Sequence, residues 1–237
     1  VLLRGRDRRQ PLDLDIPEKK LRLKDDGTVD KVVIPERLDA HRLIEEFMIQ
    51  ANVCAADSLE KKRQPLIYRI HDAPSLAKQE ALRDFLKTLD MNLAKGGQLR
   101  ANSFNGILSK AKGKPYEVMV SEMVLRSQSQ AVYSPDNIGH FGLNLMKYAH
   151  FTSPIRRYAD LIVHRALIGS FNLGAGGITP EEEDALEEIA AEISTFERRA
   201  MAAERETVDR LVAHHLAERI GDDFDGRISG VTKAGLF

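Results

Sequence analysis

Residues 148–165 read Tyr-Ala-His-Phe-Thr-Ser-Pro-Ile-Arg-Arg-Tyr-Ala-Asp-Leu-Ile-Val-His-Arg, and this is the most informative part of the chain. Ser153 is a favoured residue for the position before a helix, and Pro154 suits the first helical position. The pattern therefore predicts a helix over about 153–171. The first backbone N–H groups of such a helix have no partner within it, so they are free to bind something else.

Two arginines fall in the first turn of this expected helix. Arg156 and Arg157 would place cations where the helix dipole disfavours them by up to about 1 kcal/mol. With the free N–H groups, their guanidinium groups form an anion site, and a local rule broken at one place is typical of function. The alternative is that Arg156 pairs with Asp160 on a solvated face, and the pattern alone does not separate the two. His164 is interpreted as structural, through a hydrogen bond to Asp160.

The rest of the chain alternates helical patterns with short strand-like runs. Apolar residues at helical spacing predict helices over about 38–62, 75–89, 102–110, 116–128 and 180–220, the last with a break. Strand-like runs lie at 12–16, 21–23, 32–34, 65–71, 131–133 and 140–145, with a turn signal at 25–27. Thr179-Pro-Glu-Glu has the order of a helix cap. The first helix is expected to bury one apolar face made of Leu43, Ile44, Phe47, Met48, Ala51, Cys54 and Ala55.

The bulk composition limits the classes of function. The chain carries 35 Lys and Arg against 36 Asp and Glu, a formal net charge of −1, so any RNA-binding surface would have to be local. The single cysteine, Cys54, excludes an internal disulfide and fits a reducing cytoplasm. The apolar runs are far shorter than the roughly 20 residues that cross a bilayer. No membrane association is therefore expected.

A family resemblance adds to this pattern. Residues 148–165 resemble, without a gap, the diagnostic run of the RNB catalytic domain of the ribonuclease II and ribonuclease R exoribonucleases, Tyr-Ala-X-X-Thr-Ser-Pro-Ile-Arg-[Arg/Lys]-Tyr-X-Asp-X-X-X-His-Arg. The resemblance continues over residues 38–56, 68–71 and 126–142, and so covers nearly the whole chain. The versions with histidine, Tyr-Arg-Ile-His and Ala-His-Phe-Thr-Ser-Pro, are similar to ribonuclease R rather than to ribonuclease II.

The resemblance implies a fold and an activity. The fold would be helix-rich α/β (α+β), with residues 1–221 as the C-terminal part of an RNB domain. Residues 222–237 would begin the OB-fold RNA-binding domain that follows it. The activity would be the hydrolytic, processive removal of nucleotides from the 3′ end of single-stranded RNA, releasing 5′-monophosphates. Single-stranded RNA would be the main partner in the cytoplasm, and other RNA-decay proteins are further candidates.

The resemblance also implies roles for five residues. Arg156 matches the arginine at the scissile phosphate, where a fixed charge suits a transition state with extra negative charge. Glu204 matches a second catalytic-site glutamate at the RNA-proximal end, and Glu45 matches the glutamate that contacts the 3′-terminal nucleotide. Arg157 is a weaker RNA-binding candidate, for a phosphate. Tyr158 is weaker still, because packing also accounts for it.

Two of these assignments compete with ordinary alternatives. Helical periodicity does not choose between Glu45 and Glu46, since both lie about equally far from the expected apolar face. For Glu204, without the resemblance, a surface ion pair with a neighbour one turn away would be favoured.

In the family, four upstream aspartates hold the Mg²⁺ that activates the attacking water. No acidic group in this chain has that spacing, so its carboxylates are interpreted as solvated. We expect no metal site here, with the magnesium ligands upstream and the fragment inactive alone. The acidic groups considered are Asp13 and Asp15, Asp25 and Asp26, residues 181–184, and Asp222, Asp223 and Asp225.

Two other classes of protein remain as alternatives. The first is a catalytically dead RNB-like protein that binds RNA, and intact upstream aspartates would argue against it. The second, ranked lower, is a helical interaction scaffold, which the near-zero net charge and the long amphipathic helix favour.

Overall fold

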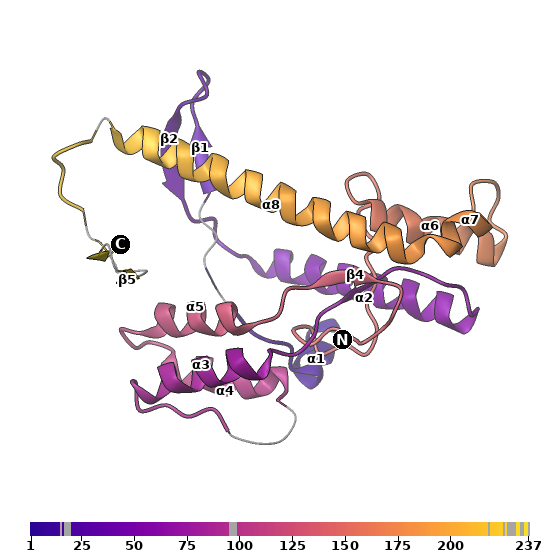
Figure 1. The fold of residues 1–237 in the computed structure, drawn as a ribbon, viewed down its shortest axis with the longest axis horizontal. Helices are drawn as coiled ribbons and strands as arrows, with labels where there is room; N and C mark the ends of the chain where they lie inside the picture. Colours follow the sequence, from indigo (N-terminus) through magenta and orange to yellow (C-terminus); the bar gives the residue numbers. More distant parts are fainter. Residues whose placement is uncertain are drawn as a thin grey trace. The chain divides into compact units, whose positions relative to one another are not determined.

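The computed structural model describes residues 1–14, 16, 20–94, 99–217, 219–224, 226, 231–232 and 235–236. The chain forms two units, one of residues 1–18 with 35–199 and the other of residues 19–34 with 200–237. Helices predominate, and the strands form small antiparallel pairs (Figure 1). The chain is therefore a helix-rich α/β protein, as the sequence predicts.

The first unit holds most of the helices. In chain order it contains α1 (Leu2–Arg9), α2 (Asp39–Lys61), β3 (Tyr68–Ile70), α3 (Leu76–Lys87), α4 (Ala101–Ala111), α5 (Glu117–Ser127), β4 (Val132–Ser134), α6 (Tyr158–Phe171), α7 (Pro180–Asp184) and the first part of α8 (Leu186–Ala217). The second unit contains β1 (Lys20–Leu23), β2 (Val29–Val33), the rest of α8, β5 (Val231–Thr232) and β6 (Gly235–Leu236). The strands pair as β1–β2, β3–β4 and β5–β6.

The helix α2 packs against α6 at the centre of the first unit. Ala55 and Ala56 of α2 lie in one buried cluster with Val163 and Ala166 of α6. Short side chains at a contact allow two helices to approach closely. The strand β3 contributes Tyr68 to the same cluster, so this core joins elements that are far apart in the sequence.

The helices α3, α4 and α5 form a second core, which we call the α3–α5 cluster (Figure 1). Phe104, Leu86, Val120 and Val124 are each fully buried in it. The predicted helix boundaries are confirmed to within about two residues here. The Ser75 hydroxyl accepts a hydrogen bond from the N–H of Lys78 and so caps α3.

The expected cap at Thr179 is confirmed. Its hydroxyl accepts from the N–H of Glu182, whose carboxylate accepts from the N–H of Thr179. The helix that follows ends after five residues, and α8 begins at Leu186. The break predicted in the long C-terminal helix therefore lies next to Ala185.

The prediction that a helix begins at Ser153 is wrong. The helix α6 begins at Tyr158, after an extended Arg157 with φ −129° and ψ 120°. Residues 153–157 form a separate turn, in which the N–H groups of Arg156 and Arg157 donate to the carbonyl of Ser153. The reason is the buried carboxylate of Asp160, which accepts from the N–H of Ser153 and bends the chain back over α6.

Two predicted strands are also wrong. Within residues 12–16, of which Asp15 lies outside the described residues, Leu12 donates to the carbonyl of Gly142 and Asp13 donates to the Asn105 side chain. These partners belong to a loop and a helix, so no strand ladder forms. Residues 140–145 make isolated bridges, because Asn144 has a positive φ of 51° that turns the backbone back.

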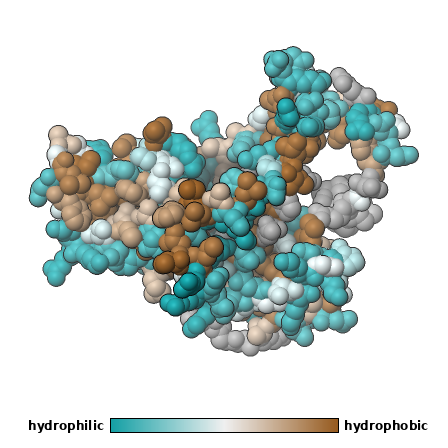
Figure 2. Space-filling view, turned by 180° about the vertical axis from the view of Figure 1, so that it is seen from behind, coloured by the Kyte–Doolittle hydropathy of each residue, from teal (hydrophilic) through white to brown (hydrophobic). Residues whose placement is uncertain are grey.

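The face that α2 buries differs from the predicted one. Leu43, Ile44, Phe47 and Met48 are exposed, and apolar side chains open to solvent are visible in Figure 2. Of the predicted face, Ala55 is buried, Ala51 is half-buried and Cys54 is exposed; the other buried positions of α2 are Glu46, Asn52, Ala56 and Leu59. Hydropathy cannot anticipate this, because it does not see the partners of a polar side chain.

Among the described residues, no helix has the length and apolar character to span a membrane.

Candidate functional site

A hollow of about 280 Å³ lies between α2 and the turn that precedes α6. We call it the Arg156 hollow. It is lined by Glu45, Met48, Ile49 and Asn52 from α2 and by Leu143, Tyr148, Thr152, Ser153, Arg156 and Arg157. The structure therefore brings together Glu45 and Arg156, which lie more than 100 residues apart in the sequence.

Arg156 presents an open cation to this hollow. Its side chain is exposed and has no hydrogen-bond or ion-pair partner in the described part of the chain. The sequence also allowed an ion pair between Arg156 and Asp160 on the surface. This pair does not form, because Asp160 is fully buried and bonds Arg157 instead. Arg156 precedes α6 and does not lie in its first turn. The unfavourable interaction with a helix dipole that the sequence predicted is therefore absent. An unpaired guanidinium beside a hollow can bind an anion.

Arg157 and Asp160 hold the turn in place. The Asp160 carboxylate accepts from Nε and Nη2 of Arg157, at 2.7 and 2.8 Å, and from the N–H of Ser153 at 2.7 Å. Burial lowers the pKa of Arg157, but the hydrogen bonds and charge of Asp160 outweigh this and raise it. Arg157 is half-buried and already paired, whereas Tyr158 is 46% exposed at the start of α6.

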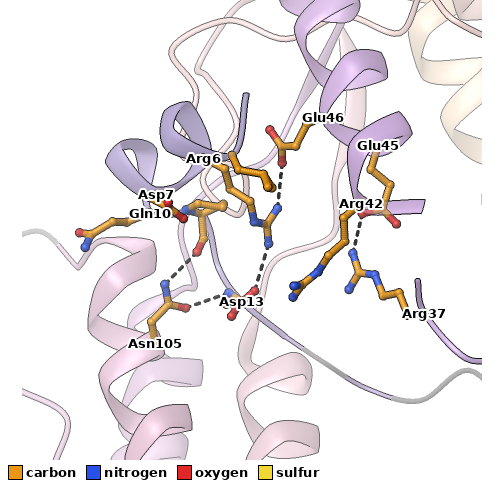
Figure 3. Close-up of a pocket in the computed structure, with 11 residues that line it drawn as sticks. Arg6, Asp7, Gln10, Asp13, Arg37, Arg42, Glu45, Glu46 and Asn105 are labelled. Carbon is orange, nitrogen blue, oxygen red and sulfur yellow. Dashed lines mark hydrogen bonds and ion pairs between the residues drawn. The ribbon is translucent and has the colours of Figure 1, made fainter. Parts of the chain in front are cut away.

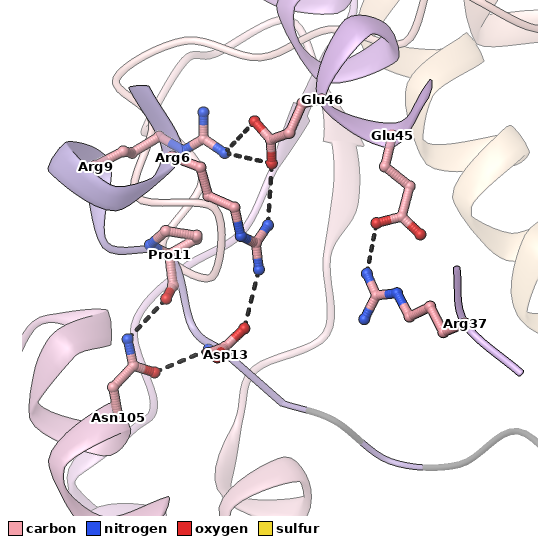
Figure 4. A network of polar contacts seen from close by, with 8 residues as sticks. All are labelled: Arg6, Arg9, Pro11, Asp13, Arg37, Glu45, Glu46 and Asn105. Carbon is pink, nitrogen blue, oxygen red and sulfur yellow. Dashed lines mark hydrogen bonds and ion pairs between the residues drawn. The ribbon is translucent and has the colours of Figure 1, made fainter. Parts of the chain in front are cut away.

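The structure separates Glu45 from Glu46. Glu46 is only 4% exposed, and it accepts hydrogen bonds from Arg6 at 3.0 Å and from Arg9 at 3.3 Å (Figure 4). Glu45 points away from this network and forms an ion pair with Arg37 (Figure 4). Glu45 is therefore the glutamate that faces the Arg156 hollow, while Glu46 joins α2 to α1.

A second hollow, of about 420 Å³, shares Glu45 as a wall (Figure 3). Its arginines are largely neutralised, because Arg6 bonds both Glu46 and Asp13 and Arg37 bonds Glu45. Arg42 lines it without an ion-pair partner among the described residues. Carboxylates and guanidinium groups nearly balance here, which distinguishes this hollow from the open Arg156.

Glu204 lies on the part of α8 that belongs to the second unit. It is exposed and forms no ion pair with a described residue, so the surface pair considered for it has no partner there. Its assignment to the catalytic site stays a prediction.

Buried aromatic and histidine rings lie behind the Arg156 hollow. The ring of Tyr148, which lines the hollow, packs edge-on against His140 and His150, with centroids 5.4 and 5.7 Å away. Burial lowers the pKa of each histidine to about 3, so both are neutral at pH 7. Burial also raises the pKa of the Tyr148 hydroxyl, which stays protonated. His164 bonds the carbonyl of Phe151 rather than Asp160 and stacks on the Phe151 ring, so its structural interpretation stands with a different partner.

Sequence reasoning gave no role to Asn52, a polar residue that lines the hollow. Its side chain is 2% exposed and bonds the loop before the turn. The sequence did contain a signal for it. Asn52 is a polar residue four positions after Met48 and three before Ala55, on the helix face that was expected to be apolar.

Comparison with known proteins places the chain in a family. The RNB domain matches residues 1–170, which include every residue that lines the Arg156 hollow. The chain belongs to the RNB domain family.

Curated relatives of this RNB chain are named Ribonuclease R. Those of Vibrio parahaemolyticus, Aquifex aeolicus and Escherichia coli are 36%, 40% and 37% identical to it over its whole length. The RNB chain spans 30%, 34% and 30% of these relatives, so it corresponds to about a third of their length. The resemblance to the ribonuclease R branch is confirmed.

Solved structures support the same fold. Mycoplasma genitalium RNase R in complex with ribose methylated single-stranded RNA matches the whole RNB chain with a TM-score of 0.90 and 28% identity, over 37% of that protein's chain. Yeast Ssd1, a pseudonuclease, matches 67% of the RNB chain with a TM-score of 0.56 and 25% identity, over 20% of its own chain.

The acidic residues that the structure describes do not gather into a magnesium site. Among the residues that the structure describes, no group of three or more His, Cys, Asp or Glu side chains could hold a metal ion. Asp13 bonds Arg6, and Asp26 accepts hydrogen bonds from Thr28, which lower the pKa of Asp26. Asp15 and Asp225 lie outside the described residues.

Proposed function

We propose that this chain is part of a hydrolytic exoribonuclease that removes nucleotides processively from the 3′ end of single-stranded RNA and releases 5′-monophosphates. The observation that carries the proposal is the Arg156 guanidinium, which has no partner among the described residues and shares a hollow with Glu45 in an RNB chain similar to ribonuclease R. Mycoplasma genitalium RNase R forms complexes with single-stranded and with double-stranded RNA, which supports RNA as the substrate.

Each of the five predicted site residues receives a role that suits its chemistry. Arg156 stabilises the negative charge that develops on the scissile phosphate, because its charge is fixed and unpaired. Glu45 contacts the 3′-terminal nucleotide, and Glu204 borders the RNA-proximal end of the same site. Arg157 contacts an RNA phosphate with the part of its guanidinium that Asp160 leaves free, and Tyr158 offers an exposed ring next to it.

The proposal includes where the metal ligands lie. The described residues do not fit Mg²⁺, and the chain spans about a third of its curated relatives. We therefore place the magnesium-binding aspartates in a part of the protein outside this chain, and residues 222–237 at the start of an OB-fold domain. The purified 237-residue chain should have no Mg²⁺-dependent nuclease activity. Release of mononucleotides from a single-stranded RNA by this chain would contradict the placement.

The proposed protein acts in the cytoplasm, where its single cysteine stays reduced. Single-stranded RNA is its main partner, and other RNA-decay proteins are candidates. A second candidate function is RNA binding without hydrolysis, which the similarity to yeast Ssd1, a pseudonuclease, favours. Hydrolysis by the full-length protein would decide between the two. The lower-ranked scaffold has no specific support in the structure, and RNA affinity that falls with salt would argue against it.

Replacement of one residue tests the mechanism. Arg156→Ala in the full-length protein should lower kcat on the order of 10²–10³-fold while RNA binding survives, because a positioned charge is lost from the transition state. Single-turnover hydrolysis and fluorescence anisotropy measure the two quantities. The control is Arg63→Ala. Arg63 is exposed and follows the end of α2 at Lys61, and that end lies about 24 Å along the helix from Glu45. Unchanged turnover in Arg156→Ala would remove Arg156 from its assigned role.

A further inference from the structure

The two walls of the Arg156 hollow come from separate parts of the chain. Glu45 lies on α2, and Arg156 lies on the turn of residues 153–157. A phosphoryl-transfer site tolerates little error in such a spacing, since a misplacement of about 1 Å can lower the rate on the order of 100-fold. The residues that hold the walls together therefore matter as much as those that touch the RNA.

Asn52 connects the two walls directly. Its Nδ2 donates to the hydroxyl of Tyr148, and its Oδ1 accepts from the backbone N–H of Phe151, each at 2.9 Å. Asn52 lies seven residues, or about two turns, after Glu45, so both side chains lie on one face of α2. The same side chain lines the hollow.

The bond to Phe151 reaches Arg156 through a short, tied segment. Only four residues separate Phe151 from Arg156. Within them the N–H of Ser153 is held by the buried Asp160, and the N–H of Arg156 bonds the carbonyl of Ser153 at 3.3 Å. The segment is thus fixed to α2 at one end and to α6 at the other.

A carboxamide suits this position better than an apolar side chain. Its two ends have opposite polarity, and each meets a partner of the matching kind, so one orientation satisfies both. Asn52 is 2% exposed, and Tyr148 is buried beside it at 8%. Without the amide, the half-buried N–H of Phe151 and the buried hydroxyl of Tyr148 lose their partners, and the segment is free to shift towards other ones.

We propose that Asn52 is a positioning residue, which sets the geometry of Arg156 relative to Glu45 and thereby the rate of hydrolysis. The proposal rests on the function proposed above. It assigns to Asn52 no contact with the reacting atoms, so its removal should act through Arg156.

The test compares three variants of the full-length protein in single-turnover hydrolysis of a single-stranded RNA. Asn52→Leu, which keeps the size but loses both hydrogen bonds, should lower kcat on the order of 10- to 100-fold with RNA affinity nearly unchanged. Asn52→Asp should recover part of the rate, because its carboxylate accepts from both the Phe151 N–H and the Tyr148 hydroxyl. Gln128→Leu is the control, since Gln128 is a buried carboxamide whose side chain, among the residues that the structure describes, bonds Val124 and Ser127 of α5.

A double substitution separates positioning from general loss of structure. If Asn52 acts through Arg156, then Asn52→Leu should slow Arg156→Ala by less than about threefold, because the aligned group is already gone. Should Asn52→Leu not fold, the same cycle is run with Asn52→Asp, whose partial loss should also vanish in Arg156→Ala.

Each outcome has a separate meaning. Multiplicative losses in the double variant, or an unchanged kcat in a folded Asn52→Leu, would overturn the positioning role while the nuclease assignment stands. Absence of hydrolysis by the unaltered full-length protein would overturn the proposed function and the positioning role with it.

Discussion

The α3–α5 cluster and the Arg156 hollow bury different kinds of side chain. The cluster is filled by apolar residues such as Phe104, Leu86 and Val124, all fully buried. The walls of the hollow depend on Asn52 and Asp160, which are equally buried but polar. Apolar packing has no preferred direction, whereas a hydrogen bond has one. The cluster therefore stabilises the unit, and the polar residues fix where individual groups of the site lie.

The largest expected effect is a loss of stability in acid, and it comes from the two histidines behind the Arg156 hollow. The folded state lowers the pKa of His140 and of His150 from 6.5 to about 3. Their neutral forms stabilise the fold fully above about pH 6.5, and this stabilisation is lost as pH falls towards 3, because only the unfolded chain takes up the protons. Each histidine should remove about 1.4 kcal/mol of unfolding free energy per pH unit below 6.5.

Urea denaturation at several pH values measures this loss. Arg69 faces both histidines. His71 and His150 also face His140, while Arg157, Asp160 and Arg156 face His150. Burial and their mostly positive charge both oppose protonation. In His150→Phe the slope between pH 6.5 and 4.5 should fall by about 1.4 kcal/mol per pH unit, the share of one histidine. An unchanged slope would show that His150 takes up its proton in the folded state.

The next contrast concerns one buried residue from each region. Asp160→Leu should lower the unfolding free energy by about 3–5 kcal/mol, because it leaves the half-buried Arg157 and the N–H of Ser153 without a partner. Leu86→Met in the α3–α5 cluster should cost less than about 1.5 kcal/mol, since it preserves apolar volume. Equal losses in urea denaturation would mean that the two regions do not differ in the way described.

The smallest expected effect tests the outer face of α2. Phe47→Ala should change the unfolding free energy by no more than about 0.5 kcal/mol, because the ring is 56% exposed. A buried phenylalanine, such as Phe104, typically costs about 3–5 kcal/mol on the same replacement. A loss of that size at Phe47 would mean that its ring is buried, as the hydropathy pattern predicted.

Local signals located most of the helices correctly. The cap at Thr179 depends on neighbouring residues, and the structure has it where it was predicted. The helix expected from Ser75 and the break expected in the C-terminal helix are present too, the break next to Ala185. The start of α6 was missed although Ser153 and Pro154 form a good local signal. Asp160 outweighs that signal by holding the N–H of Ser153 from within the helix itself.

The residues 148–165 were sufficient to indicate the RNB family and an arginine at its site, because such a run of residue types is recognisable without any structure. The resemblance pointed to Glu45, but periodicity did not separate it from Glu46. The physical difference required the fold, because the two are equivalent on an isolated helix until Arg6 and Arg9 pair with Glu46. The importance of Asn52 required it as well, since its partners lie almost 100 residues away. Residue type and local order are properties of the chain, but the partner of a buried polar group is a property of the packed molecule.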